Sequence, residues 1–197
     1  MQLVMGTTCC RGAILTTPPL TTPPLTTPPL TTPPLTAQVC IFLTTARLTQ
    51  LYAELFNGLG VSGVLEIHSR KSQPQRTRVA ERFRAGSRML LFTSDVSARG
   101  MDYPDVTAVV QVGLPSDRAQ YIHRLGRTAR AGKAGGGHLL LADFERFFLN
   151  SLRDLPVQTR PPLGAAEVAA LQPVLQKGFG ALNPVTLGTS YQARPLV

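Results

Sequence analysis

The 197-residue sequence contains no tryptophan and only three cysteines, Cys9, Cys10 and Cys40. So few cysteines exclude a disulfide-built scaffold, and no cysteine–histidine cluster has the spacing of a zinc site. No hydrophobic run reaches the roughly 18 residues that a membrane-spanning helix needs, because charged residues, glycine or proline interrupt every run. The sequence therefore predicts an intracellular protein in a reducing compartment, with no metal site and no membrane partner.

Negative charge and lysine are also scarce. Eleven acidic residues stand against 20 basic ones, which gives a net charge of +9, and 17 of the basic residues are arginine. The guanidinium group is a rigid fork of donors that binds phosphate through two hydrogen bonds at once. This composition favours a protein that binds nucleotides or nucleic acid, and a merely soluble basic surface is the alternative.

Residues 16–35 repeat the sequence TTPPL four times. Proline fixes φ and has no backbone N–H, so we expect a tail of residues 1–36 that is disordered or forms extended polyproline II. The repeat is interpreted either as a ligand for a proline-binding module or as a low-complexity tail, including one from a mispredicted reading frame. In both cases we expect that removing residues 1–36 leaves the stability of the folded part unchanged.

From residue 37 onward, short apolar runs alternate with helical spacing. The apolar runs predict strands at residues 39–43, 64–67, 88–93, 108–112 and 138–141. The helical spacing predicts helices at residues 48–56, 73–85, 117–125, 143–152 and 165–175. Such alternation predicts an α/β fold with a parallel sheet covered by helices on both faces. The predicted domain covers residues 37–157, and ligands of such sheets bind at the carboxyl ends of the strands.

The first polar cluster, TSDVSARGMD, begins at Thr93 after a predicted strand. The hydroxyls of Thr93 and Ser94 can cap a helix or donate to a phosphate. Gly100 permits a close backbone approach, and Asp102 can accept a hydrogen bond from a ribose hydroxyl. An ordinary capped turn explains the hydroxyls and Gly100, but it does not explain Arg99 together with Asp102.

The second polar cluster, YIHRLGRTARAG, begins at Tyr121 and carries Arg124, Arg127 and Arg130 at a spacing of three. These arginines share one face if a helix continues, and they surround one site if Gly126 ends the helix. Like charges so close together cost stability unless an anion or an acidic partner is present. The cluster therefore indicates an anion site, with a solvated helix face as the alternative.

In this order and spacing, the clusters resemble the second RecA-like lobe of DEAD-box RNA helicases. The segment IFLTT at residues 41–45 is similar to motif IV, and Gln73 with Arg76 is similar to the QxxR motif. Residues 94–102 resemble motif V and residues 123–132 resemble motif VI, although Ala129 stands where many members have glycine. The amino-acid sequence of these motifs most resembles the branch that contains fungal mitochondrial and plant organellar helicases, whose lobe continues into a helical extension. We expect residues 158–197 to be a truncated form of that extension.

The resemblance implies half of an ATP-dependent RNA helicase, which is an ATP hydrolase. Arg127 and Arg130 match the catalytic arginine fingers that reach the γ-phosphate of ATP, and Asp102 matches the aspartate that contacts the ribose. Further matches on the ATP side are Gly100, His123 and Arg124. The matches to residues at or beside the RNA sugar-phosphate backbone, which is bound without reading the bases, are Gln73, Arg76, Thr93, Ser94 and Gly100.

The chain contains neither a GxxxxGK[ST] phosphate-binding loop nor a DEAD-like quartet. We therefore expect ATP with Mg²⁺ to be held mainly by a first lobe that this chain lacks, so that the isolated chain is inactive. That lobe and RNA are the expected partners, and the compartment (mitochondrion, plastid, nucleus or cytoplasm) is left open. The alternative function is a noncatalytic RNA-binding or regulatory module that keeps the lobe without turnover.

His68 lies between the second predicted strand and the QxxR segment. It is either a loop residue that faces the backbone or a surface histidine without a task, and the surface interpretation is the more common case for a lone histidine. We therefore expect His68 to be exposed.

Overall fold

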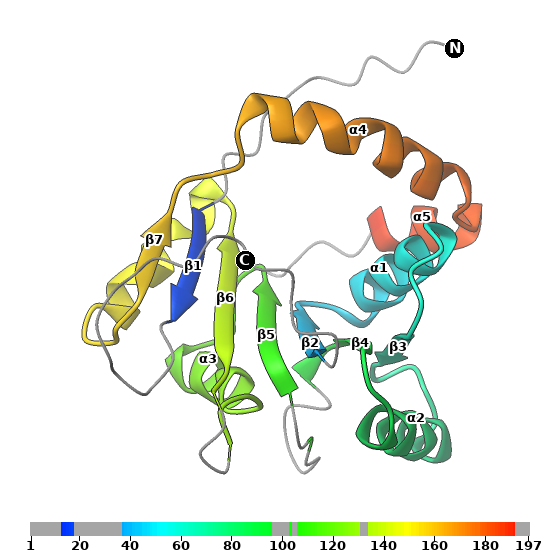
Figure 1. Cartoon of the computed structure of the whole chain (residues 1–197), viewed down its shortest axis with the longest axis horizontal. Coiled ribbons are helices and arrows are strands. Elements are labelled where there is room, and N and C mark those ends of the chain that lie inside the picture. Colours follow the sequence, from blue (N-terminus) through cyan, green and yellow to red (C-terminus); the bar gives the residue numbers. More distant parts are fainter. Residues whose placement is uncertain (1–12, 18–36, 96–102, 104–105, 131–133, 192–197) are drawn as a thin grey trace.

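The computed structural model describes residues 13–17, 37–95, 103, 106–130 and 134–191, which form one sheet with helices on both faces (Figure 1). The sheet has seven strands in the order β3-β4-β2-β5-β6-β1-β7. The strands are β1 (Ala13–Thr17), β2 (Gln38–Leu43), β3 (Val64–Ile67), β4 (Leu90–Thr93), β5 (Val106–Val112), β6 (Gly136–Leu141) and β7 (Gln158–Arg160). The five strands from β2 to β6 are parallel, which confirms the predicted α/β fold.

The helices divide between the two faces of the sheet. They are α1 (Ala46–Gly58), α2 (Gln73–Ala85), α3 (Arg118–Leu125), the 3-10 helix η2 (Asp143–Leu152), α4 (Ala165–Gly180) and α5 (Pro184–Tyr191). Helices α2, α3 and η2 contribute to the core on one face, and α1 packs on the other. Two of the helices begin at side-chain caps, where Thr45 accepts from the Leu48 N–H and Asp117 accepts from the Gln120 N–H.

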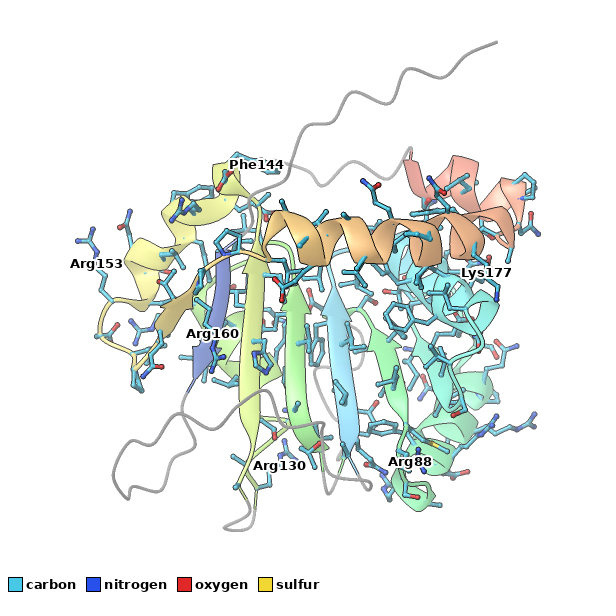
Figure 2. The ribbon with its side chains drawn as sticks, turned by 45° about the horizontal axis from the view of Figure 1, so that its top comes forward. Arg88, Arg130, Phe144, Arg153, Arg160 and Lys177 are labelled. Atoms are coloured by element: carbon cyan, nitrogen blue, oxygen red, sulfur yellow. The ribbon has the colours of Figure 1, made fainter. Side chains whose placement is uncertain are left out.

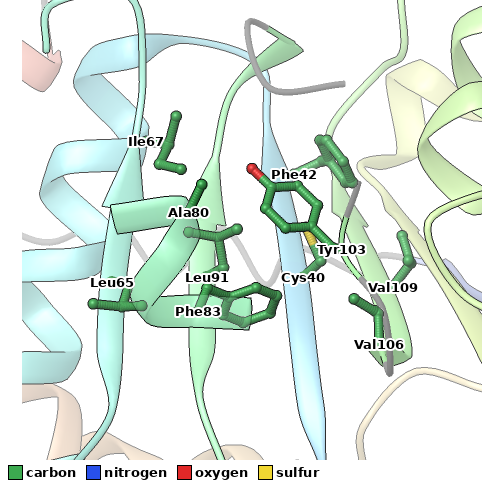
Figure 3. Close-up of a cluster of buried hydrophobic side chains, with 10 residues drawn as sticks. All are labelled: Cys40, Phe42, Leu65, Ile67, Ala80, Phe83, Leu91, Tyr103, Val106 and Val109. Carbon is green, nitrogen blue, oxygen red and sulfur yellow. The ribbon is translucent and has the colours of Figure 1, made fainter. Parts of the chain in front are cut away.

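The core under α2 fixes the end of the first polar cluster. Tyr103, which follows that cluster directly, is fully buried against Phe83, with ring centroids 5.4 Å apart and an interplanar angle of 88°. Figure 3 shows the Tyr103 ring lying over Cys40 and beside Phe42, between α2 and the strands. An edge-on aromatic pair of this kind contributes beyond the area that it buries. Tyr103 therefore anchors the cluster to the face of the sheet that carries α2.

Strand β1 corrects the expectation that all of residues 1–36 lie outside the fold. Residues 13–17 run antiparallel to β6, with Ala13 opposite Leu141 and Thr17 opposite Gly137, and they also pair with β7. This strand was not expected, because the strands that hold it are more than 100 residues away in the chain. The rest of the TTPPL repeat, residues 18–35, lies outside the described residues, so the predicted tail stays a prediction there.

After β7, helices α4 and α5 fold back onto α1. Helix α4 confirms the helix expected at residues 165–175 and runs five residues further, although Pro173 lies inside it. A Cβ atom on Gly178 would lie 2.6 Å from a methyl of Leu55, so glycine allows α4 to approach α1 closely. Helix α5 is tied to α1 by a hydrogen bond of 2.8 Å from the Arg47 guanidinium to the Thr189 carbonyl. Among the described residues, no helix is both long enough and apolar enough to span a membrane.

Candidate functional site

The expected RNA-side residues Gln73 and Arg76 lie in the first turns of α2. The helix begins after Ser72, whose N–H donates to the Gln75 side chain at 3.0 Å, and Pro74 occupies an early position where no N–H is needed. Gln73 is exposed and Arg76 is half-buried, with its Nε enclosed and without a hydrogen-bond partner. The start of α2 therefore presents one amide and one guanidinium group close together.

Thr93 and Ser94 lie at the carboxyl end of β4, and both are buried. The Thr93 hydroxyl donates to the Ile67 carbonyl at 3.0 Å, and the Ser94 N–H donates to the same carbonyl at 3.2 Å. These bonds join β4 to the end of β3. Thr93 therefore positions the end of the strand, whereas the resemblance placed it at or beside the RNA backbone.

Arg124 is the most unusual residue of the second polar cluster, because only 1% of its side chain is exposed. Its Nε and Nη2 each lie 2.7 Å from Oδ1 of Asp95, which also accepts a hydrogen bond of 2.6 Å from Gln120. The guanidinium carbon lies 5.5 Å from the centre of the Phe42 ring, within the range of a cation–π contact. Asp95 stands next to the undescribed part of the first cluster, so this network fastens the two clusters together.

Arg127 and Arg130 follow the end of α3 at Gly126, and both are half-buried. The Nε atom of Arg127 donates to the His123 carbonyl at 3.2 Å, and that of Arg130 donates to the Gly126 carbonyl at 2.7 Å. These main-chain bonds restrict both side chains at the Nε end. The residue between them, Thr128, is buried and donates to the Val106 carbonyl at 2.6 Å.

The turn that holds the two arginines is strained at Ala129. Its φ is +55°, in the left-handed region where a side chain is unfavourable and glycine is preferred. A Cβ atom on Gly135 would lie 2.7 Å from the Ala129 nitrogen, so the chain passes very close to this turn. The backbone geometry therefore gives a physical reason for the glycine that many members of the resembled family carry here.

The charge of Arg127 acts on the buried thiol of Cys40. Burial raises the pKa of the Cys40 thiol to about 12, and the nearby Arg127 charge opposes that rise. A thiol with such a pKa stays protonated at neutral pH and is a poor nucleophile. Cys40 therefore serves as a core residue on the sheet beside the arginines.

His68 is buried, with 3% of its side chain exposed, so the surface interpretation is wrong. Its Nδ1 accepts a hydrogen bond of 3.3 Å from the Arg70 N–H, and its Nε2 lies 3.7 Å from a carboxylate oxygen of Glu66. Burial raises the pKa of Glu66, but the nearby His68 side chain and the ion pair with Lys71 outweigh it and hold that pKa below its ordinary value. His68 therefore supports the turn between β3 and α2.

The site residues do not share one edge of the sheet. Thr93 and Ser94 lie at the carboxyl end of β4, whereas Thr128 contacts Val106 at the amino end of β5. The arginines after α3 are therefore displaced toward the amino ends of the strands, away from the carboxyl edge where ligands were expected. Gly100 and Asp102 lie outside the described residues.

Sequence reasoning missed Asp95 and Gln120 as members of the site. Asp95 was visible between Ser94 and Val96, but nothing in the sequence identified its partner 29 residues away. Gln120 lies one helical turn before Arg124, so the two can reach the same carboxylate. This spacing of four residues was the one feature of the sequence that could have identified Gln120. No group of three or more metal-binding side chains occurs in the described part of the chain.

Comparison with known proteins shows the family of this chain. The model of the helicase conserved C-terminal domain matches residues 34–132, half of the chain. DEAD-box ATP-dependent RNA helicases 26 and 25 of Arabidopsis thaliana are both 53% identical to it over 156 residues, which is 79% of the chain. The chain belongs to the DEAD-box helicase family. It spans 18% and 27% of the lengths of those two DEAD-box proteins.

Solved DEAD-box structures have the same fold. Mss116p DEAD-box helicase domain 2 bound to an RNA duplex matches with a TM-score of 0.63 and 30% identity, covering 80% of this chain and 65% of that one. Mss116p bound to single-stranded RNA and AMP-PNP matches with a TM-score of 0.61 and 29% identity, covering 80% of this chain and 33% of that one. The sheet and its helices are therefore those of a RecA-like helicase C-terminal domain. The narrower resemblance to the organellar branch stays a prediction.

Proposed function

We propose that this DEAD-box domain acts as the second lobe of an ATP-dependent RNA helicase and supplies two arginine fingers, Arg127 and Arg130. The observation that carries this proposal is the pair of main-chain hydrogen bonds that hold the two guanidinium groups after α3. A preorganised cation stabilises charge that develops in a phosphoryl transfer without reorganisation at the moment of reaction. The relatives are named as ATP-dependent helicases, which supports ATP as the nucleotide.

The ion pair between the buried Arg124 and Asp95 supports the same proposal. Arg124 is enclosed and bonded to Asp95, so it is a positioning residue here, although the resemblance placed it on the ATP side. It fixes the last turn of α3, from which Arg127 continues. His123 is exposed on that turn and is proposed to face the γ-phosphate side, and Asp102 and Gly100 are proposed to contact the nucleotide.

The described residues suit only one side of an ATP molecule. They provide cations for a phosphate, whereas a first lobe would supply the phosphate-binding loop and the Mg²⁺ ligands. ATP would supply the phosphoryl group that is transferred to water. RNA would lie along Gln73, Arg76 and Ser94, which are proposed to hold its sugar-phosphate backbone without regard to sequence.

The test is an ATPase measurement on the chain mixed with the purified first lobe of a DEAD-box relative, with and without RNA. We expect Arg130→Ala to lower the RNA-stimulated rate by roughly 10³-fold or more, as loss of an arginine finger does in other phosphoryl-transfer enzymes. Arg153→Ala, which removes an exposed arginine of no proposed role, is the matched control and should leave the rate unchanged.

Near-normal turnover by the mixture that contains Arg130→Ala would contradict the proposal and favour the alternative, in which the second polar cluster is a solvated helix face. If the wild-type mixture binds RNA but shows no stimulated turnover, the noncatalytic RNA-binding module becomes the better description. The two functions are therefore separated by one set of reactions.

A further inference from the structure

Helix η2 carries two phenylalanines on its surface that the proposed function does not use. Phe144 is 73% exposed and Phe147 is 62% exposed. Residues three apart in a 3-10 helix eclipse one another, so the two rings project from the same face of η2. Asn150, which is also exposed, continues this face one turn later. These three residues form the aromatic face of η2.

The opposite side of η2 is fixed to the body of the protein. Phe148 and Leu152 are buried in the core beneath the helix. The carboxylate of Glu145 accepts hydrogen bonds from the Leu114 N–H at 3.2 Å and from the Ala142 N–H at 2.8 Å. The aromatic face is therefore held in place by the packing of the rest of the helix.

The aromatic face lies apart from both proposed sites. Figure 2 shows Phe144 at the opposite end of the strands from Arg130, which is a proposed arginine finger. Helix α2, which carries the proposed RNA contacts, lies at the other side of the sheet from η2 (Figure 1). A single exposed apolar side chain is ordinary, but two large neighbouring ones are typical of an interaction surface.

The TTPPL repeat is the other feature of the chain without a role in the proposed function. Its sequence predicts polyproline II with three residues per turn, so a leucine and the first proline of the next copy, such as Leu20 and Pro23, share one edge. Aromatic surfaces bind such segments because little conformational entropy is lost on binding. One copy spans about 16 Å, and Phe144 to Asn150 spans about 12 Å, so one copy covers the aromatic face.

The polar end of the aromatic face suits the backbone of the same ligand. Proline has no N–H, so a proline-rich segment offers mainly carbonyl acceptors. The side-chain amide of Asn150 has two N–H donors and is exposed. It can donate to a carbonyl of the repeat while the rings of Phe144 and Phe147 contact its prolines and leucine.

We propose that the aromatic face of η2 binds the TTPPL repeat of a second copy of this chain. The ends of the repeat favour a second copy over the same one. Thr17 lies opposite Gly137, near the amino end of β6, and β2 also begins at the amino edge of the sheet. Phe144 instead follows the carboxyl end of β6, so a repeat bound within its own chain would have to pass along roughly 17 Å of strand and return.

The arrangement is reciprocal, because every copy carries one aromatic face and one repeat. Two chains that exchange their repeats make two contacts and leave neither face uncovered. The second contact then forms within the complex, which strengthens the association by roughly 10² to 10⁴-fold over a single contact when both can be made together. We therefore expect a dimer that forms with increasing protein concentration.

The test is sedimentation of the full chain from about 1 to 200 µM, where a contact of micromolar affinity is populated. We expect F144A/F147A to weaken the association at least about 30-fold, as loss of an interface hot spot does. Its melting temperature should stay that of the wild type, because both rings are exposed. A variant with all eight prolines of residues 18–34 replaced by serine keeps the length of the segment and should also stay monomeric.

Mixing these two variants gives the sharpest result. F144A/F147A keeps the repeat and the serine variant keeps the aromatic face, so together they can make one contact although neither associates alone. We expect a one-to-one complex in the mixture, weaker than the wild-type dimer by roughly 10²-fold because the second contact is missing. A labelled TTPPLTTPPL peptide should bind the serine variant and should not bind that variant when F144A/F147A is added to it.

The matched control is L171A/L175A, which removes two exposed apolar side chains from α4 and should associate like the wild type. Equal loss in this control would indicate general hydrophobic association and overturn the inference. Wild-type association by F144A/F147A would overturn it too. A monomeric wild type contradicts it as well: if the peptide binds the serine variant but not the wild type, the repeat occupies its own chain, and if it binds neither, the face does not take the repeat. The proposed function stands or falls separately, by the ATPase measurement.

Discussion

Arg124 shows how one buried charge can join two parts of a site that are distant in the sequence. Taking a guanidinium ion out of water costs several kcal/mol, and the structure offsets that cost with Asp95 and the Phe42 ring. Because Asp95 belongs to the first polar cluster and Arg124 to the second, the pair sets their relative position. The spacing of three in the sequence suggested three arginines with one task, but the fold gives Arg124 a different task from Arg127 and Arg130.

We predict that Asp95→Ala lowers the free energy of unfolding by about 2 to 3 kcal/mol, because it leaves the Arg124 charge buried and unpaired. The effect stays at or below the lower end of the usual range because 44% of the Asp95 side chain is exposed. Urea denaturation measures it. Asp154→Ala is the control, since it breaks an exposed pair with Arg118 and should leave stability close to that of the wild type. Equal effects of the two variants would contradict the role given to Arg124.

We predict that Ala129→Gly stabilises the protein by about 0.5 to 1 kcal/mol. The left-handed backbone at this residue costs alanine about 1 to 2 kcal/mol, and part of the gain is lost to the greater freedom of glycine in the unfolded chain. Ala53→Gly, in the middle of α1, should have the opposite sign. Denaturation curves of the two variants give both values, and a loss of stability in Ala129→Gly would show that the turn is not strained.

At the scale of elements, β1 connects the chain start to the far side of the sheet. It lies between β6 and β7, so its removal would leave β7 without a neighbour and β6 paired only with β5. From Thr17 to residue 37 the chain has to pass the three strand spacings that separate β1 from β2, about 14 Å. Ten residues reach roughly 33 Å when extended, so half of the segment is enough to close this connection.

We predict opposite results for two deletions in this region. Removal of residues 1–17 should lower the melting temperature by about 4 to 8 °C, because the lost backbone hydrogen bonds of β1 contribute at least about 2 kcal/mol. Removal of residues 21–30, two copies of the repeat, should leave it unchanged, since halving a loop changes its closure free energy by only about 0.6 kcal/mol. Thermal unfolding followed by circular dichroism decides, and equal melting temperatures of the first variant and the wild type would place β1 outside the stable fold.

At the scale of the whole molecule, the proposed arginine fingers follow α3 and the proposed RNA contacts Gln73 and Arg76 lie on α2, and both helices cover the same face of the sheet. The opposite face carries α1, to which α4 and α5 attach, so these two helices pack away from Arg127 and Arg130 (Figure 1). The chain spans about a fifth to a quarter of the DEAD-box relatives that it matches. This arrangement supports the proposed function as one lobe of a helicase.

We predict that the purified chain alone hydrolyses no ATP above background, with or without RNA. Arg127 and Arg130 can stabilise a phosphate, but the sequence has no GxxxxGK[ST] loop to hold one and no DEAD-like quartet to hold Mg²⁺. Phosphate release measured over a range of ATP concentrations checks this. Saturable, RNA-stimulated release from the chain by itself would contradict it.

The sequence alone determined the parallel core and the motifs. Strands β2 to β6 and helices α1 to α3 were predictable because their signal, an apolar period or run, lies within each segment. The arginines of the second cluster were recognisable because their spacing is local too. Helix η2 was expected over the same residues, and only its 3-10 geometry was not.

The tertiary structure decided the features that depend on distant partners. Strand β1 is held by β6, more than 100 residues away, and β7 pairs with β1 in turn. The same applies to Thr93, Arg124 and His68, whose polar groups were expected at a ligand or at the surface and are buried instead. A polar side chain faces inward only where the fold supplies a hydrogen-bond or charge partner, and that partner is set by the packing of elements rather than by neighbours in the sequence.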